Sequence, residues 1–326
     1  MIFSRAPLRI SLGGGGTDLP SYYSDHEGFV VSGAVDKYVY MLVHTTFQQR
    51  YRMKYSEIEE VDDVSNIRHP ILRETLMRHW RGNPLEIASV ADVPAGTGMG
   101  SSGAFTVCLL KALACARRTS ATPASLAEAA CHIEMDVLKE PVGKQDQYVA
   151  AHGGICTYTF RRDGGVDVDP VELDSETLRK MGSHLLLFYT GSARSASTIL
   201  ADQDARSRSA DSAMIENLHR TKELGYESRD LLLKGDLPGY ASLMHEHWLH
   251  KRTRSEGMAN PRIDRLYDVA LDSGAIGGKL VGAGGGGFLL VYTESPEDTR
   301  SAMTAESASE LAFNFEFGGA VATEFS

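Results

Sequence analysis

The sequence predicts an α+β fold divided into two domains, and three observations lead to this expectation. The chain has 326 residues, of which 42% are hydrophobic, so it is long enough for two ordinary buried cores. Short segments rich in β-branched and aromatic residues are interspersed with longer segments typical of helices. Three glycine clusters interrupt them, near the start, in the first third and near the end of the chain. We expect one domain over residues 1–165 and a second over 166–326.

The first half is expected to begin with strands and continue with helices. The strand segments are apolar or alternating and rich in β-branched and aromatic side chains. Thr122 is a plausible N-cap, and Pro123 suits the first position of the helix that follows. The expected elements are strands at 9–12 and 29–43 and helices at 70–81, 102–118 and 123–138.

The second half is expected to contain both long helices and a terminal α+β portion. Residues 161–169 are polar and read as a turn-rich link, which is why the domain boundary is placed there. The third glycine cluster lies in the terminal portion. A strand at 155–160 precedes this link, and the elements expected after it are a strand at 183–189 and helices at 195–234 and 240–254.

The segment Pro94–Gly103 is the strongest functional signal in the chain. Its glycines allow tight turns and close approach of a ligand, and the apolar run 104–116 predicts that a helix begins directly after it. The free N–H groups and positive dipole end of such a helix favour a phosphate. Ser101 and Ser102 add hydroxyls that can cap the helix or bind a metal-bound phosphate.

Other phosphate-binding motifs fit this segment less well. Gly98-x-Gly100-x-x-Gly103 matches the dinucleotide fingerprint formally, but no acidic residue follows about 20 positions later, where 119–124 read Thr-Ser-Ala-Thr-Pro-Ala. No Walker A loop is present, and the protein-kinase triplets His-Arg-Asp and Asp-Phe-Gly are missing. The loop therefore indicates a different architecture.

Taken together, the three glycine clusters resemble the three motifs of the GHMP kinases, which include galactokinase, mevalonate kinase and homoserine kinase. The first cluster lies within Arg5–Pro20, and the third, Gly282–Gly287, runs into a strand-like segment. The middle one matches the family pattern Pro-x-x-x-Gly-Leu-Gly-Ser-Ser-Ala except at Met99 and Gly103, both of which are conservative in size. The resemblance implies a two-domain GHMP kinase fold with its active site in the cleft between the domains.

Within the family, the motif sequences are most similar to those of the D-glycero-D-manno-heptose 7-phosphate kinases. This resemblance implies ATP-dependent phosphorylation of the anomeric hydroxyl of a heptose 7-phosphate to the 1,7-bisphosphate, for nucleotide-activated heptose in surface glycans, with ATP and Mg²⁺ required. The segments that carry it are Gly13–Pro20, Val35–Val39, Lys54–Ser56, Glu59–Val61, His69–Pro70, Arg73–Glu74, Gly143–Tyr148 and Asn260–Asp264.

The resemblance also assigns catalytic and metal-binding residues. Asp146 matches the aspartate beside the acceptor hydroxyl, as a base or orienting carboxylate, although an aspartate there can also simply cap a helix. Arg9 can stabilise the transferred phosphoryl group or keep Asp146 ionised. Ser102 and Glu134 would bind Mg²⁺, and a solvated helix glutamate is the alternative for Glu134.

The remaining expected contacts belong to the nucleotide and the sugar. Asp18 matches the family's sugar-binding aspartate and can also cap the segment after Gly16. We expect cations to meet the substrate phosphate because the chain as a whole is acidic; Lys251 and Arg252 are secondary candidates. The nucleotide-binding set is Gly96, Thr97, Gly98, Met99, Gly100, Ser101, Ser102 and Gly103. The substrate-binding set is Gly15, Gly16, Thr17, Asp18, Lys144 and Arg194.

Two further motifs receive structural interpretations. His245-Glu246-His247-Trp248-Leu249-His250 does not match the His-Glu-x-x-His zinc motif, so we expect its histidines on the exposed side of a helix. The third glycine cluster precedes a strand and not a helix, so we expect it to pack closely against the active site.

Charge and composition restrict the class of partner. A net charge of −10 argues against general binding to nucleic acid or to an anionic membrane surface. The first residues lack the apolar core of a signal peptide, no apolar stretch is long enough for a membrane span, and the four cysteines suggest reduced thiols, so a cytoplasmic protein is expected. The partners expected are ATP and a sugar phosphate, and the oligomeric state stays open, with a homodimer as one option.

Three alternatives to the heptose kinase remain open. A fucose-like or other hexose 1-kinase of the same family would need no cation for a substrate phosphate. A non-catalytic sugar-sensing protein could share the fold, but Arg9, Ser102, Glu134 and Asp146 are all present. A nucleotide-dependent decarboxylase could also share it, and the sugar-kinase wording of Gly143–Gln147 disfavours that reading.

Overall fold

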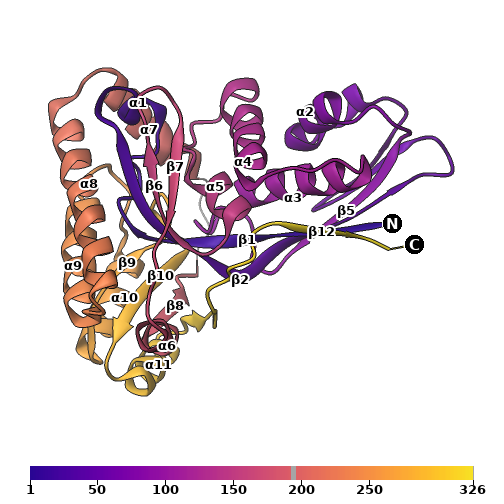
Figure 1. The fold of residues 1–326 in the computed structure, drawn as a ribbon. Helices are drawn as coiled ribbons and strands as arrows, with labels where there is room; N and C mark the ends of the chain where they lie inside the picture. Colours follow the sequence, from indigo (N-terminus) through magenta and orange to yellow (C-terminus); the bar gives the residue numbers. More distant parts are fainter. Residues whose placement is uncertain (192–195, 326) are drawn as a thin grey trace.

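The computed structural model describes residues 1–191 and 196–325, which form two β-sheets with helices packed around them (Figure 1). The larger sheet is built around two long antiparallel strands, β1 and β2. Its order is β12-β1-β2-β5-β3-β4, with β6 also paired to β2 and β7 to β6. The strands of this sheet are β1 (Ile2–Gly13), β2 (Gly28–Thr45), β3 (Tyr51–Lys54), β4 (Ile58–Val61), β5 (Leu85–Ala91), β6 (Ile155–Phe160), β7 (Val166–Pro170) and β12 (Val321–Glu324).

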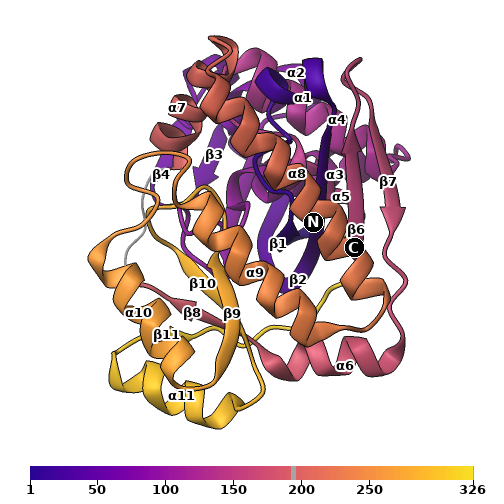
Figure 2. The same cartoon turned by 90° about the vertical axis from the view of Figure 1, so that its left-hand side faces the viewer.

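The smaller sheet is antiparallel, has the order β11-β8-β10-β9 and belongs to the second half of the chain (Figure 2). Its strands are β8 (Leu185–Tyr189), β9 (Ala275–Leu280), β10 (Phe288–Thr293) and β11 (Ser309–Glu310). Helices α9 (Leu237–Lys251) and α10 (Pro261–Asp272) pack against β9, and α8 (Ser212–Leu233) packs against α9 and the long strands β1 and β2.

The helices of the first half lie mostly along one side of the long strands (Figure 1). They are α1 (Pro20–His26), α2 (Pro70–His79), α3 (Ser101–Ala116), α4 (Pro123–Cys131) and α5 (Gln145–His152), with short 3-10 and π-helical segments at Val64–Asn66 and His132–Val137. Those of the second half are α6 (Ser175–His184), α7 (Ala196–Arg208), α8 (Ser212–Leu233), α9 (Leu237–Lys251), α10 (Pro261–Asp272) and α11 (Pro296–Ala305). Among the described residues, no helix is long and apolar enough to cross a membrane.

The predicted elements exist, but several of their boundaries differ. Thr122 is the N-cap of α4, as expected, and its hydroxyl accepts from the N–H of Ser125 at 3.2 Å. The single helix expected over 195–234 is two helices, because Ala210 has a positive φ of 54° and Asp211 caps the start of α8. The prediction of a turn-rich link over 161–169 was wrong in part, since β7 begins at Val166 and pairs with β6.

The chain crosses between its two halves more than once. Strand β7 continues the larger sheet beyond residue 165, and β12 returns from the C-terminus to pair with β1. The two chain ends therefore lie side by side in Figure 1. The domain boundary near 165 stays a prediction, because these pairings give no clean division of the chain at that point.

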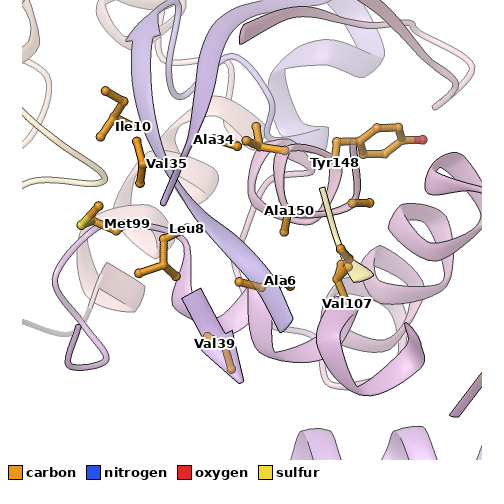
Figure 3. Close-up of a cluster of buried hydrophobic side chains, with 14 of the residues drawn as sticks. Ala6, Leu8, Ile10, Ala34, Val35, Val39, Met99, Val107, Tyr148 and Ala150 are labelled. Carbon is orange, nitrogen blue, oxygen red and sulfur yellow. The ribbon is translucent and has the colours of Figure 1, made fainter. Parts of the chain in front are cut away.

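The main hydrophobic core connects the sheet to the helices and to the middle glycine loop. Ala6, Leu8 and Ile10 of β1 are buried in this core, and Val107 of α3 and Tyr148 of α5 belong to the same cluster (Figure 3). Met99, in the glycine loop, is buried in the same core beside Leu8. The loop is therefore anchored by a side chain that packs inward, which fixes its backbone relative to β1.

Candidate active site

A cavity of about 890 Å³ lies between the two halves of the chain. Its wall includes the ends of β1 and β9, the first and middle glycine loops and the start of α5. The volume lies in the range typical of small-molecule sites. All three glycine clusters contribute to this wall, although they are far apart in the sequence.

The middle loop presents the N-terminus of α3 to the cavity. Gly96, Gly98 and Gly100 have φ values of 77°, 82° and 75°, a region that favours glycine. Gly100 is the N-cap and no side chain caps the helix, so the first N–H groups of α3 are left for a ligand. The expectation that Ser101 or Ser102 caps this helix was therefore wrong, but both residues line the cavity.

Three predicted loop residues face inward instead of lining the cavity. Thr97 is buried, and its hydroxyl donates to the carbonyl of Pro94 at 2.9 Å. Met99 packs in the core, and its carbonyl accepts from the N–H of Arg9 at 3.1 Å. Gly103 faces α5. The side chains of Thr97 and Met99 thus shape the loop. The backbone contacts expected between these three residues and a nucleotide stay a prediction.

Arg9 and Asp146 are far apart in the sequence and contact each other at the cavity. Arg9 lies on β1, and Asp146 lies in the first turn of α5. The Arg9 Nε and Nη2 atoms lie 2.8 Å and 2.7 Å from Asp146 Oδ1, and Nη1 donates to the carbonyl of Gly98. One guanidinium thus links the predicted catalytic carboxylate to the glycine loop.

The close approach of α3 to α5 depends on Gly103. A Cβ at this position would lie 2.8 Å from Asp146 Cβ and 2.9 Å from the Gln147 amide nitrogen. The family pattern has alanine here, so this departure has a local cause in the packing. Glycine at 103 lets Asp146 sit directly beside the helix start.

Asp18 is held in the cavity by the first glycine loop and α5. Its Oδ1 accepts from the N–H of Gly16 at 3.1 Å, and its Oδ2 accepts from the N–H of Gln145 at 3.2 Å. Burial, together with the charge of Asp146, raises the pKa of Asp18. Gly15 and Gly16 also line the cavity.

Thr17 does not reach the cavity, although it was predicted to bind substrate. Its side chain is fully buried, and its hydroxyl donates to the carbonyls of Gly14 and Phe29 at 2.9 Å and accepts from the N–H of Phe29. These hydrogen bonds occupy the Thr17 hydroxyl and fix the loop against β2, so Thr17 supports the loop and its side chain does not face the cavity.

The third glycine cluster packs against the middle loop, as predicted. A Cβ on Gly282 would lie 2.5 Å from Gly98 Cα, and one on Gly98 would lie 2.5 Å from the Val281 carbonyl oxygen. A side chain at either position would separate the two loops. This contact connects the C-terminal half to the loop that precedes α3.

Glu134 is buried behind Ser102. The Ser102 hydroxyl donates to its Oε2, and the side-chain amide of Gln147 donates to its Oε1 at 3.1 Å. Burial raises the pKa of Glu134 to about 7, against the opposing effect of these hydrogen bonds. Among the described residues, no lysine, arginine or histidine forms an ion pair with Glu134.

One end of the cavity is aromatic, and sequence reasoning did not identify it. Tyr55, His69 and Phe105 line it, with the His69 ring stacked on Phe105 at 5.0 Å between centroids and Tyr55 set edge-on to His69 at 4.8 Å. Tyr55 and His69 belong to segments already noted for their family resemblance, but no periodicity indicated that they share a wall with the glycine loop.

Lys144 lies away from this cavity, contrary to its predicted role. Its ammonium group donates to both carboxylate oxygens of Glu128, at 3.2 and 3.3 Å, and to the carbonyl of Gly164 at 2.6 Å. These bonds hold it in a separate, smaller hollow beside Pro20 and α4. Arg194, the other predicted phosphate ligand, lies outside the described residues.

His247 corrects the expectation of exposed histidines on α9. It is buried and lines the cavity, whereas His245 is bonded to the Tyr267 hydroxyl at 2.7 Å and His250 to the carbonyl of Asn217 at 2.9 Å. Two further cavity cations, Arg254 and Lys279, were not singled out from the sequence. They are separated in the chain, and their burial is visible only in the fold.

Comparison with known proteins places this site in a family. Residues 69–154 match the family model described as the GHMP kinases N terminal domain, and residues 228–308 match the one described as GHMP kinases C terminal. The D-glycero-alpha-D-manno-heptose 7-phosphate kinase of Campylobacter jejuni is 26% identical over 305 residues, covering 90% of this chain and 89% of the relative. The galactokinase of Thermococcus kodakarensis is 25% identical, with 89% and 88% coverage.

Solved structures share the whole fold. A D-glycero-D-manno-heptose 1-phosphate kinase from Bacteroides thetaiotaomicron superposes with a TM-score of 0.80 at 24% identity, and the match covers all of both chains. Lactococcus lactis galactokinase complexed with galactose superposes with a TM-score of 0.79 at 15% identity, covering 99% and 95%. At these identities the superpositions establish the fold alone.

Proposed function

Because the chain belongs to the GHMP kinase family, we propose that it transfers the terminal phosphoryl group of ATP to the anomeric hydroxyl of D-glycero-D-manno-heptose 7-phosphate. The chain is a carbohydrate kinase of the GHMP type, with heptose phosphate kinases among its relatives. The finer proposal, a 7-phosphate substrate and a 1,7-bisphosphate product, takes its substrate from the Campylobacter jejuni relative. Its main support within the molecule is the meeting of Arg9, Asp146 and the glycine loop in one cavity.

The nucleotide is expected to lie along the middle loop. The uncapped N–H groups at the start of α3 suit its phosphates, since a helix N-terminus favours an anion. The aromatic end formed by Tyr55, His69 and Phe105 suits a flat purine base. Both features lie on the wall of the same cavity, so one bound ATP can use them together.

Ser102 and Glu134 fit a magnesium ion. Both offer oxygen ligands, and Glu134 is a buried carboxylate without a cationic partner among the described residues. A bound Mg²⁺ would be coordinated mainly by phosphate and water oxygens, with few protein ligands, and would offset the phosphate charge. The described part of the chain has no cluster of three or more His, Cys, Asp or Glu suited to a metal, in keeping with such a sparse site.

The transfer itself needs little covalent chemistry from the protein. The anomeric oxygen forms a bond to the γ-phosphorus while the bond from that phosphorus to the β,γ-bridging oxygen breaks, leaving ADP. Asp146 orients the hydroxyl and accepts its proton. Arg9 holds Asp146 and offers positive charge toward the transferred group, and Asp18 accepts hydrogen bonds from sugar hydroxyls.

ADP release over a sugar panel tests this proposal. The purified protein is assayed with MgATP and heptose 7-phosphate, mannose 6-phosphate, unphosphorylated heptose, fucose or galactose, for wild type and Asp146→Asn. We expect turnover with heptose 7-phosphate and a loss of at least 10³-fold in kcat in the variant, whose fold is checked by circular dichroism. Preferred turnover of a plain hexose would replace the substrate assignment. ATP binding without turnover of any sugar would favour a sensor.

A further inference from the structure

A group of buried cations covers the side of the cavity that comes from the second half of the chain. Lys251 ends α9, Arg254 follows it, and Lys279 lies near the end of β9. Their exposed fractions are 7%, 3% and 3%. His247 lines the same wall, one turn before Lys251. We call Lys251, Arg254 and Lys279 the cationic wall.

None of these three cations pairs with a carboxylate within salt-bridge distance among the described residues. Arg254 is held by neutral oxygens, with bonds to Asn217 Oδ1 at 2.9 Å and Thr221 Oγ1 at 2.6 Å. Lys251 donates to the carbonyls of Leu280 and Gly282. These bonds orient the charges without neutralising them.

Lys279 is the least satisfied of the three. It is 97% buried, lines the cavity and makes no hydrogen bond or salt bridge to any described residue outside its own strand ladder. An unpartnered ammonium group in such a place is costly unless a ligand meets it. Burial and the charge of Arg9 lower the pKa of Lys279 to about 7. Burial and repulsion from Arg254 and Lys279 lower the pKa of Lys251 well below its usual value.

Nearby carboxylates do not balance this charge. Asp146 is already bonded to Arg9, and Asp18 is the remaining carboxylate close to Arg254. Asp92 is the other acidic residue that lines the cavity, and its carboxylate accepts hydrogen bonds from the Tyr38 N–H and the Tyr40 hydroxyl. This end of the cavity therefore carries an excess of positive charge, in a chain whose net charge is −10.

The cationic wall adjoins the predicted sugar loop. Arg254 Nη1 donates to the carbonyl of Gly15 at 3.2 Å, and Gln203 donates to the carbonyl of Gly16 at 2.8 Å. The nucleotide phosphates have their own donors at the start of α3. We propose that Lys251, Arg254 and Lys279 form the subsite for the phosphate already present on the sugar substrate. This inference rests on the proposed function and replaces Lys144 in that role.

A comparison of phosphorylated and unphosphorylated heptose tests the subsite. For Lys279→Met and Lys251→Met, we expect KM for heptose 7-phosphate to rise 10- to 100-fold, as a lost charge-assisted hydrogen bond predicts. KM for ATP and kinetics with unphosphorylated heptose should change less than threefold. Lys180→Met, at an exposed position on α6, is the matched control.

Three results would overturn the inference. Equal losses with both sugars would indicate a general catalytic or structural role, and a rise in KM for ATP would assign the wall to the nucleotide. A phosphate-specific loss in Lys144→Met, with none in Lys279→Met, would restore the earlier prediction. Circular dichroism and thermal unfolding identify a variant that misfolds. If either Lys279→Met or Lys251→Met misfolds, the kinetics of the other variant test the subsite.

A binding measurement separates this inference from the identity of the sugar. With saturating ADP present to occupy the nucleotide loop, inorganic phosphate should raise the melting temperature of wild type but not of Lys279→Met. If no heptose is turned over and this difference is still seen, the proposed substrate fails and the phosphate subsite stands. Equal stabilisation of both proteins by phosphate would contradict the subsite.

Discussion

Replacing Lys279 with methionine should stabilise the protein, although it removes a residue expected to bind substrate. Methionine keeps much of the length of the lysine side chain and needs no counter-ion. In wild type, the buried ammonium group lies near Arg9 on β1 and near His247 and Lys251 on α9. All of these neighbours are cations or become cationic on protonation, so none of them stabilises its charge.

The size of the effect follows from the pKa of Lys279, which is about 7 in the folded protein against 10.5 for an unperturbed lysine. One pH unit of difference corresponds to about 1.4 kcal/mol. Well below pH 7, the group is charged in both the folded and the unfolded chain, and the cost of burying it is at its full value, at most roughly 5 kcal/mol. At pH 7 the folded group is about half protonated, and the cost begins to fall.

The cost should decrease as the pH rises. Above pH 7 the folded protein holds Lys279 neutral while the unfolded chain still binds the proton, so the free energy of unfolding of wild type increases with pH relative to the variant. The advantage of Lys279→Met should fall by about 1.4 kcal/mol per pH unit, to roughly 2 kcal/mol at pH 9, and vanish near 10.5.

Urea unfolding followed by circular dichroism at pH 6, 7, 8 and 9 measures this difference. Wild type, Lys279→Met and the exposed control Lys180→Met are compared at equal protein concentration, and the control should stay within about 0.5 kcal/mol of wild type. A less stable Lys279→Met, or an advantage that is constant between pH 7 and 9, would refute the reasoning, because either result means that the folded protein keeps Lys279 protonated and well solvated.

Three further predictions concern the nucleotide side of the cavity. Gly103→Ala should lower kcat on the order of 100-fold in steady-state assays, because its Cβ would push Asp146 from its place beside α3; unchanged kcat would show that α5 shifts freely. Glu134→Gln should raise the Mg²⁺ concentration needed for half-maximal rate at least tenfold, measured by titration at fixed ATP, and an unchanged requirement would remove Glu134 from the metal site. Phe105→Ala should raise KM for ATP about tenfold while leaving KM for the sugar unchanged, and the reverse pattern would place the sugar at the aromatic end.

Much of the site was predictable because its elements carry local signals. Glycines with positive φ mark the loop before α3, and the apolar run after them marks the helix, so their conjunction could be read without a fold. The pairing of Arg9 with Asp146 followed from family motifs that lie 137 positions apart. In each case the chemistry depends on residues inside a recognisable motif.

The substrate-phosphate side could not be predicted in the same way. Lys144 was favoured because it lies two positions before Asp146, but as the N-cap residue of α5 its side chain points to Glu128, away from the cavity. His247 and Lys279 become cavity residues only because α9 packs against β9. Burial and long-range packing decide such positions, and neither is encoded in local spacing.

The unpaired cations of the cavity also offer a physical basis for choosing between substrates. A sugar without a phosphate would leave Lys251, Arg254 and Lys279 as buried and unneutralised as they are in the ligand-free protein, so it would gain no binding free energy from them. A sugar phosphate brings the missing negative charge, and its attraction to the three cations offsets the cost of burying them. The same interaction should stabilise the folded protein whenever the phosphorylated substrate is bound. Selectivity for a sugar phosphate and a reduced stability of the ligand-free protein are therefore expected to have one cause.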